Sequence, residues 1–362
     1  MSKLDFATID DDLDLKKLLS QNPMDSWVNI SLEREPSYFD GVSLMGGTYT
    51  LVSRENSNLV GMYSLTSMDV HINGTSQRVS YLAELRVQKI FRHKIRLLKE
   101  GFDSIKKLLP KDSTKEFFFT SIATQNHKAR RLLEANIKGM PRYEKQGQMS
   151  TLVFSNKISK NHNLFKKANS KDIDDIVYFY NKQASKYQFS PCLSKEWLKN
   201  LDGKKALTID DFYIARDHNK ELMACAALWD QRAFKQSVIK GYRSPLKYLR
   251  VIYNIYANFT KRVTLPKKDQ RIESVFISFF AYNDHNTAIK ALYELSDLSK
   301  NINKVDSCIL GVSSQNTILG LIKKEFKPSI YLTEIETVTL SSEDLATDML
   351  DDLIVQPEVA LL

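Results

Sequence analysis

A basic segment that joins a strand pattern to a helix pattern is the clearest place for chemistry in this sequence. Between Arg86 and Lys99 there are six lysines and arginines and no acidic residue. Arg78–Val87 alternates as a strand does, and Ile95–Leu109 has apolar residues at helical spacing. A helix that begins here presents unpaired backbone N–H groups and the positive end of its dipole. We therefore expect an anion site around Arg92, suited to a diphosphate.

Metal and cysteine chemistry have little support in the sequence. The three cysteines, Cys192, Cys225 and Cys308, are far apart and lack CxxC spacing, so we expect no disulfide framework and no structural zinc. No two histidines have the i, i+4 spacing of a helical metal site. Cys225 lies among alanines in a strand pattern and is expected in the core. This cysteine usage predicts a reducing, cytoplasmic location.

Length and composition indicate a globular protein of more than one domain. The chain has 362 residues, of which 43% are apolar and 26% are charged. Its net charge of +9 allows anionic partners, although a solvated basic face would have the same composition. No stretch approaches the roughly 20 apolar residues of a membrane helix, and the first residues are acidic, so neither secretion nor a membrane partner is expected.

The two halves of the chain share three patterns in the same order, which favours a duplication. They are a strand, an acidic turn and a helix (Phe6–Leu19 and Phe165–Tyr180), a hairpin (Gly47–Leu65 and Asp211–Trp229), and a strand, a Gln-Asn turn and a helix (Phe117–Lys138 and Ser307–Lys327). Each half has the elements of an α/β layer with a mixed sheet. We predict two domains, 1–156 and 164–340, followed by an acidic and apolar tail at 341–362.

The order of these elements resembles the GNAT N-acetyltransferase superfamily over both halves. Leu85, Val87 and Arg92 match the L-x-V strand end and the arginine of its R-x-x-G-x-G/A loop, whereas the two glycines are absent here. The segment Ala227–Tyr242 is similar to the second half of uncharacterised bacterial tandem GNAT proteins. The sequence therefore looks like two GNAT-like acyl-CoA N-acyltransferase domains in tandem.

A second motif supports the resemblance. The pattern N-x-x-A-x-x-L-Y/L-x-x-G is matched at Asn126, Ala129, Leu132 and Leu133, and Asn136 replaces its glycine. Asn126 is expected to cap the helix that follows it, whatever the function.

The resemblance implies an acyltransferase that uses acetyl-CoA as co-substrate, without a metal. It implies cofactor contacts from both motifs, and the predicted residues are Leu85, Val87, Arg92, His93, Lys94, Ile95, Arg96, Asn126, Ala129 and Leu132. The acceptor is an amine of a small molecule or a protein that the sequence does not identify. Glycine lets a backbone approach phosphate closely, so its absence predicts a weaker or differently shaped phosphate site.

The second half departs further from the family. Its strand end, Ile277–Lys290, has no arginine, and Asp284 would oppose a phosphate. We expect this half to have lost cofactor binding and either to shape the acceptor site or to cover the sheet edge of the first half.

Acyl transfer to an amine needs a proton acceptor, a group that polarises the thioester carbonyl, and a proton donor for the thiolate. By resemblance, Glu84 is the predicted general base, and a surface or paired glutamate is the alternative. A backbone N–H near Val87 would polarise the carbonyl. Because Leu133 stands where the family often has a tyrosine, Tyr143 is the predicted donor; the alternative is a tyrosine that packs at a loop.

Two other functions remain open: an aminoacyl transferase that uses charged tRNA, and a non-catalytic acyl-CoA-binding or interaction module. Arg232–Lys268 mixes basic and aromatic residues, as nucleic-acid surfaces do. The spacing of Tyr248, Val251, Ile252 and Ile255 favours an amphipathic helix instead, so a nucleic-acid partner is not expected.

Overall fold

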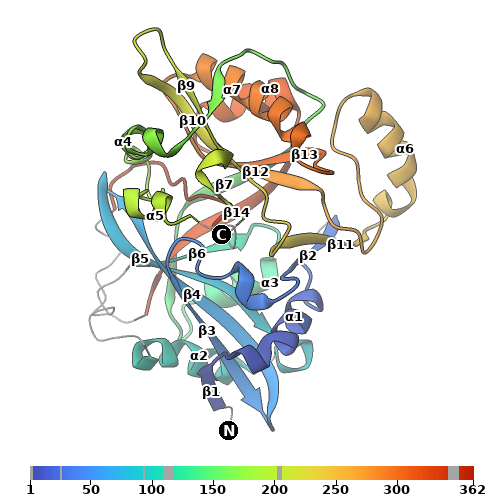
Figure 1. Ribbon diagram of the computed structural model, residues 1–362. Helices are drawn as coiled ribbons and strands as arrows, with labels where there is room; N and C mark the ends of the chain where they lie inside the picture. The colour runs from blue at the N-terminus through green and yellow to red at the C-terminus, as the bar shows by residue number, and fades with distance from the viewer. Residues whose placement is uncertain (1–2, 25–26, 93, 109–116, 202–205, 341–349) are drawn as a thin grey trace.

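One large twisted sheet runs through the whole molecule, with helices on both of its faces (Figure 1). The computed structural model describes residues 3–24, 27–92, 94–108, 117–201, 206–340 and 350–362. The N-terminus lies at one end of the molecule, and the C-terminus lies near its centre.

Twelve strands of the described chain form this sheet, in the order β1-β3-β4-β5-β6-β14-β7-β13-β12-β10-β9-β8. Only the neighbours β5/β6 and β12/β13 are parallel, so the sheet is mixed, as predicted. The strands are β1 (Lys3–Phe6), β3 (Gly47–Glu55), β4 (Asn58–Ile72), β5 (Thr75–Val87), β6 (Phe117–Ala123), β7 (Arg142–Ser155), β8 (Phe165–Lys167), β9 (Phe212–Arg216), β10 (Leu222–Trp229), β12 (Ser274–Tyr282), β13 (Ser307–Ser313) and β14 (Ser329–Thr339).

The last strand of each half pairs with strands of the other half. β14 lies between β6 and β7, and β7 in turn pairs with β13. The sequence predicts both strands but not this exchange, because a strand pattern does not identify its partner. The two halves therefore share one continuous set of backbone hydrogen bonds.

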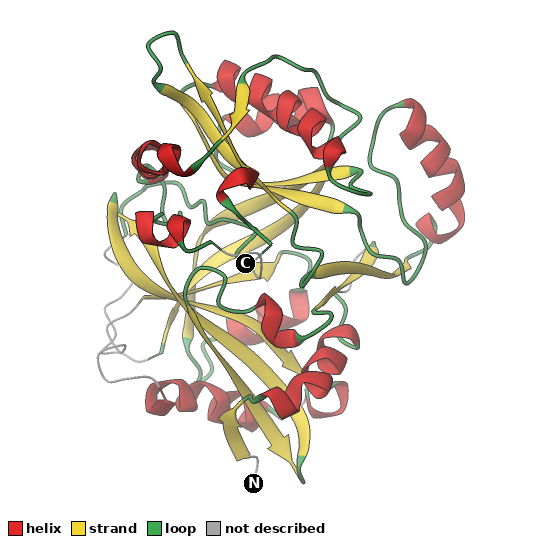
Figure 2. Cartoon of the chain, viewed as in Figure 1, coloured by secondary structure: helices red, strands yellow, loops and turns green. Residues whose placement is uncertain are grey.

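A second, two-stranded sheet also joins the halves. β2 (Val28–Glu33) pairs with β11 (Gln236–Tyr242), about two hundred residues later in the chain. The helix predicted within Arg232–Lys268 is present as α6 (Leu246–Phe259), directly after β11. Figure 2 shows α6 at the side of the molecule, connected by loops.

Helices cover the large sheet in two layers. α2 (Ile95–Leu108) packs on one face of the first half, and α7 (His285–Leu298) and α8 (Ile318–Phe326) pack on the same face of the second half. The opposite face is covered by α1 (Asp12–Ser20), α4 (Ile173–Ala184) and α5 (Lys195–Lys199). The short helix α3 (His127–Leu133) follows β6. In the described residues no helix is both long enough and apolar enough to cross a membrane.

The C-terminal segment, residues 350–362, lies against the sheet between the two halves. Val355 and Val359 are buried, and each rests on a glycine of a neighbouring strand, Gly147 or Gly311. A Cβ atom added to either glycine would come within 2.4 Å of the valine. The absence of side chains at these two positions therefore lets the segment approach the backbone.

Candidate active site

The parallel strands β5 and β6 separate part of the way along their length. Their register runs from Val79–Phe117 to Leu82–Thr120 and ends there, although β5 continues to Val87. The hydroxyl of Thr120 donates to the carbonyl of Leu82 at 2.7 Å, at the point of separation. The strands then open into a V at their carboxyl ends, where ligands of α/β folds commonly bind.

A bulge at Glu84 accompanies this opening. Glu84 has a φ of 54°, and the register of β4 with β5 shifts between Ser64–Ala83 and Met62–Arg86. Leu82 and Leu85 therefore lie in the same hydrophobic cluster, although they are three residues apart. The regular alternation of a strand does not predict this arrangement.

The carboxylate of Glu84 is held on the face of the sheet opposite α2. It accepts hydrogen bonds from Arg34 at 2.8 and 3.3 Å and from the Tyr38 hydroxyl at 2.8 Å. The side chains of Arg34 and Glu84 are only 11% and 12% exposed. Burial raises the pKa of Glu84, but Arg34 and Tyr38 outweigh it and hold the pKa below the ordinary value. Glu84 is thus the anionic member of a buried ion pair with Arg34.

The chain turns from β5 into α2 where the anion site is predicted. A short 3-10 turn at Lys89–Phe91 leads to Ile95, and the first turn of α2 contains no acidic residue. Leu85 and Val87 line a small apolar pocket under α2, with Leu97 and Leu98. Ile95 is exposed at the start of the helix.

The basic side chains of this turn have partners within the chain. The Arg92 guanidinium donates to the carbonyl of Val87 at 3.2 Å and to the side-chain oxygen of Asn22. Lys94 and Arg96 pair with Glu55 and Glu100 at 2.8 and 2.7 Å, and all three basic side chains are exposed. His93 lies outside the described residues. A phosphate that binds here would replace these surface ion pairs by its own contacts with the basic side chains. Each surface ion pair contributes little to stability, so its loss would cost little.

The second motif lies at the end of the neighbouring strand. Asn126 caps α3 as predicted, since its side chain accepts from the amide of Ala129 at 3.3 Å. Ala129 and Leu132 are half-buried on this helix. Because β5 and β6 are parallel, the two motifs follow carboxyl ends at the same edge of the sheet, and the fold brings them to the two sides of the V.

Tyr143 does not join Glu84. It lies on β7, which two strands, β6 and β14, separate from β5, and it packs edge to face against Phe102 of α2, with ring centroids 6.4 Å apart. Burial raises the pKa of Tyr143 above its ordinary value. The structure thus places the predicted base and the predicted acid on opposite faces of the sheet.

Close to Tyr143, β14 carries a buried carboxyl group. Glu336 is fully buried, and neither of its carboxylate oxygens has a hydrogen-bond partner among the described residues. Burial, and then the nearby carboxylate of Glu134 at the end of α3, raises the pKa of Glu336 to about 7.

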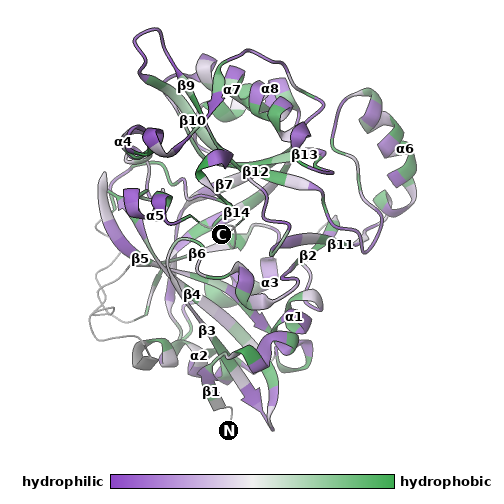
Figure 3. Cartoon of the chain, viewed as in Figure 1, coloured by the Kyte–Doolittle hydropathy of each residue, from purple (hydrophilic) through white to green (hydrophobic). Residues whose placement is uncertain are grey.

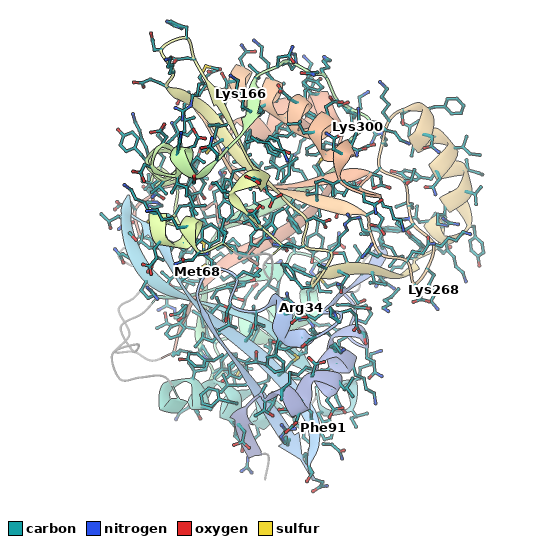
Figure 4. All side chains as sticks on the ribbon, in the orientation of Figure 1. Arg34, Met68, Phe91, Lys166, Lys268 and Lys300 are labelled. Carbon is teal, nitrogen blue, oxygen red and sulfur yellow. The ribbon has the colours of Figure 1, made fainter. Side chains whose placement is uncertain are left out.

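A second polar cluster lies between Glu84 and the C-terminal segment. The ammonium group of Lys235 donates to the main-chain oxygens of Leu362 at 2.7 Å and Ala360 at 3.3 Å. Burial, and then the charge of Arg34, lowers its pKa to about 7, against the opposing charge of Glu84. Its burial thus favours the neutral amine, which can accept a proton. Figure 4 labels Arg34 near the middle of the molecule, where the two halves meet.

The second half repeats the V and its bulge with different contents. β12 and β13 pair in parallel only from Ser274 to Phe276, and Phe279 then has a φ of 52°, with a register shift against β10. The amide of Phe279 donates to the carboxylate of Glu358 at 2.8 Å. Burial raises the pKa of Glu358 to about 7. The bulge of the second half is thus covered by an acid from the C-terminal segment.

A described cavity lies in this second V. It has a volume of about 400 Å³ and is lined by Tyr180, Phe280, Tyr282, Asp284 and Glu358, among others. Asp284 caps α7 by accepting from the amide of Thr287 at 3.0 Å, and hydrogen bonds from Thr287 keep its pKa below the ordinary value. The pocket beside β5 is far smaller, about 30 Å³.

Four residues of these clusters were not identified from the sequence: Arg34, Tyr38, Lys235 and Glu358. They come from a turn after β2, the loop before β11 and the C-terminal segment, and none belongs to a motif. Only Lys235 had a local signal, as a lysine within the basic and aromatic segment.

Solved structures share this fold. Saccharomyces cerevisiae N-myristoyltransferase with bound myristoyl-CoA has a TM-score of 0.62 and 12% identity, over 98% of this chain and 88% of that chain. A probable N-acyltransferase from Enterococcus faecalis V583 has a TM-score of 0.51 and 12% identity, over 93% and 72%. A GCN5-related N-acetyltransferase from Anabaena variabilis has 0.51 and 12%, over 94% and 73%.

These likenesses identify the fold, which is that of GNAT-type N-acyltransferases, as the sequence predicted. No family model matches the chain, and no curated protein matches its sequence.

Proposed function

We propose that the chain is an acyl-CoA-dependent N-acyltransferase, built from two GNAT-like units at residues 1–156 and 164–340, in which the first unit binds the acyl-CoA. The observation that carries this proposal is the V between β5 and β6, with a helix start at its edge that is basic and has no acid in its first turn. The related fold of a protein that binds myristoyl-CoA supports it.

The difference between the two Vs supports this assignment of the cofactor. In the second V the bulge amide is bonded to Glu358 and the helix start is capped by Asp284. Two carboxyl groups disfavour a diphosphate and favour a cationic group. We therefore assign the cavity of the second unit to the acceptor amine, which would also contact the faces of Tyr180 and Tyr282.

For proton removal from the amine we propose Lys235, with Glu84 as a positioning residue. Lys235 does not line the second cavity itself, but it lies within the electrostatic influence of Glu358, which does. The sequence-based hypothesis made Glu84 the base. Its pair with Arg34 lowers its basicity and fixes the bulge, whereas the pKa of Lys235, about 7, matches work near neutral pH. Tyr143 packs on the other face, so the proton donor to the thiolate stays unassigned.

Thermal shift with acetyl-CoA and longer acyl-CoAs tests the proposal. A ligand at about one hundred times its Kd adds about 2.7 kcal/mol to the free energy of unfolding. The chain length that gives the largest shift identifies the acyl group; acetyl is the sequence-based expectation. Protection by no acyl-CoA would contradict the proposal, and tight binding without transfer to any amine would favour a non-catalytic module.

Arg92→Ala should raise the Kd for acyl-CoA about tenfold or more, because a charge-assisted hydrogen bond contributes about 1.5–3 kcal/mol. Arg78→Ala is the matched control, since Arg78 pairs with Asp69 on the exposed part of β5 and β4. Equal affinities of the two variants would remove the start of α2 from the phosphate site. With amines as ligands, Asp284→Asn should reduce the thermal shift if the acceptor occupies the second cavity.

A further inference from the structure

The outer face of α6 is apolar and exposed to solvent. Seven large apolar side chains of this 14-residue helix are exposed: Tyr248, Leu249, Val251, Ile252, Ile255, Tyr256 and Phe259. Ile252 is 65% exposed and Phe259 is 86% exposed. In Figure 3, green apolar segments alternate with purple polar ones along α6, which stands away from both helix layers of the sheet. Single exposed apolar residues are ordinary, but a contiguous face of seven indicates a binding surface.

The polar side of α6 faces its own chain, whereas a surface helix usually turns its apolar side toward the protein core. Asn254 donates to and accepts from the backbone of Leu265, at 3.0 and 2.8 Å, and Arg250 donates to the same carbonyl at 3.0 Å. The hydroxyl of Tyr253 donates to the carbonyl of Val263 at 3.4 Å. These bonds fix the rotation of the helix about its axis and keep the apolar face outward.

The segment around α6 is also strongly basic. From Arg243 to Lys268 there are seven lysines and arginines and no acidic residue, so it holds seven of the nine net positive charges of the chain. Lys247 and Lys261 are exposed close to the ends of the helix, and Figure 4 labels Lys268 at the edge of the molecule near α6.

We propose that α6 docks on the surface of an anionic phospholipid membrane. A helix with an apolar face and basic flanks lies in the plane of such a surface, with its apolar side chains among the acyl chains and its cations at the headgroups. A helix of this length extends about 21 Å, which is too short to cross a bilayer. The absence of a spanning segment, on which the sequence-based expectation of no membrane partner rested, does not bear on this mode.

The charges disfavour the other occupants. A second copy of the chain would cover the apolar face but would bring two segments of the same strong charge together. A nucleic acid would satisfy the cations but would leave Val251, Ile252 and Ile255 against a polar surface. An anionic membrane satisfies both features.

Sedimentation of the full chain with vesicles tests the proposal, which does not depend on the enzymatic one. Wild type should bind vesicles of phosphatidylcholine with phosphatidylserine, bind vesicles of phosphatidylcholine alone far more weakly, and dissociate as salt is raised. Each buried apolar side chain contributes about tenfold in partitioning. The variant Ile252→Glu/Phe259→Glu should therefore bind about a hundredfold more weakly.

Leu13→Glu is the control, because Leu13 is 75% exposed on α1, far along the chain from α6. It should bind vesicles as wild type does. Both variants should keep the wild-type melting temperature, since they alter exposed side chains. No vesicle binding by wild type, or equal binding by the double variant, would overturn the proposal. Two other results would also overturn it. One is self-association of the wild type without lipid that the double variant abolishes, and the other is RNA binding that the double variant weakens as much as vesicle binding.

Discussion

The buried pair of Arg34 and Glu84 allows the two roles considered for Glu84 to be separated. Glu84→Gln removes the charge but keeps the shape of the side chain and a hydrogen-bond acceptor for Tyr38. Arg34 would then lie 11% exposed without its carboxylate. Breaking a buried ion pair in this way costs about 3–5 kcal/mol, so we expect the free energy of unfolding to fall by that amount, as measured by urea denaturation.

The double variant Arg34→Met/Glu84→Gln removes both charges. Replacing a buried pair by uncharged groups is often nearly neutral, so the double variant should recover most of the stability that Glu84→Gln loses. With the single variant Arg34→Met completing the cycle, the coupling energy should be about 3 kcal/mol, the upper end of the range for residues in contact. Acyl transfer, followed as the free thiol of CoA, should recover with stability if Glu84 only holds the bulge.

Two results would refute this reasoning. If the double variant were as unstable as Glu84→Gln, the pair would not be the source of the stability. If it were stable but slower than wild type by about a hundredfold or more, while Lys235→Arg kept its activity, the loss would have the size of a missing general base, and Glu84 rather than Lys235 would accept the proton.

Two further predictions concern groups with a pKa near neutrality. The rate of acyl transfer should rise as pH increases through about 7, because Lys235 becomes neutral there. Lys235→Arg should abolish transfer and leave the Kd for acyl-CoA unchanged. If the variant kept the pH–rate profile of the wild type, Lys235 would be excluded as the proton acceptor. Glu336 has its pKa raised from 4.5 to about 7, so the folded state binds more protons than the unfolded state in that window and stability falls as pH rises through it. Glu336→Gln should remove this dependence and, at about pH 8, stabilise the fold by up to about 3 kcal/mol in thermal or urea unfolding. Glu334→Gln is the control, because the Glu334 carboxylate on the same strand accepts a hydrogen bond from Gln148 at 3.1 Å; destabilisation by Glu336→Gln as large as that by the control would contradict the assignment.

Local sequence patterns predicted most of the helices and strands. The hairpin at Gly47–Leu65, the strand at Arg78–Val87 and the helix from Ile95 are all present, because alternation and helical spacing follow from which faces are buried. The exchange of β7 and β14 was not predictable in this way, since each strand is compatible with either neighbour and only the assembled sheet selects the register.

Less of the candidate site than of the fold could be predicted from the sequence. Glu84 was identified, but its bulge and its partner Arg34 were not, because a positive φ at a glutamate has no sequence signature and the partner lies fifty residues away. The helix of α6 was predicted from its spacing, but the sequence does not tell which side faces the protein. Its orientation follows from the bonds of Asn254 and Arg250 to the returning loop.

The two Vs indicate how one fold can divide the work of acyl transfer. Both have a bulge with a positive φ and a helix that starts beside it. In the first, the bulge residue is an acid that pairs with an arginine on the far face, and the helix start is left basic. In the second, the bulge residue is Phe279, and acids from elsewhere occupy its amide and the helix start. A diphosphate and an ammonium group require opposite electrostatic potentials, so these side chains favour the cofactor in the first V and the acceptor amine in the second. Lys235 is influenced by the charges of both Glu84 and Glu358.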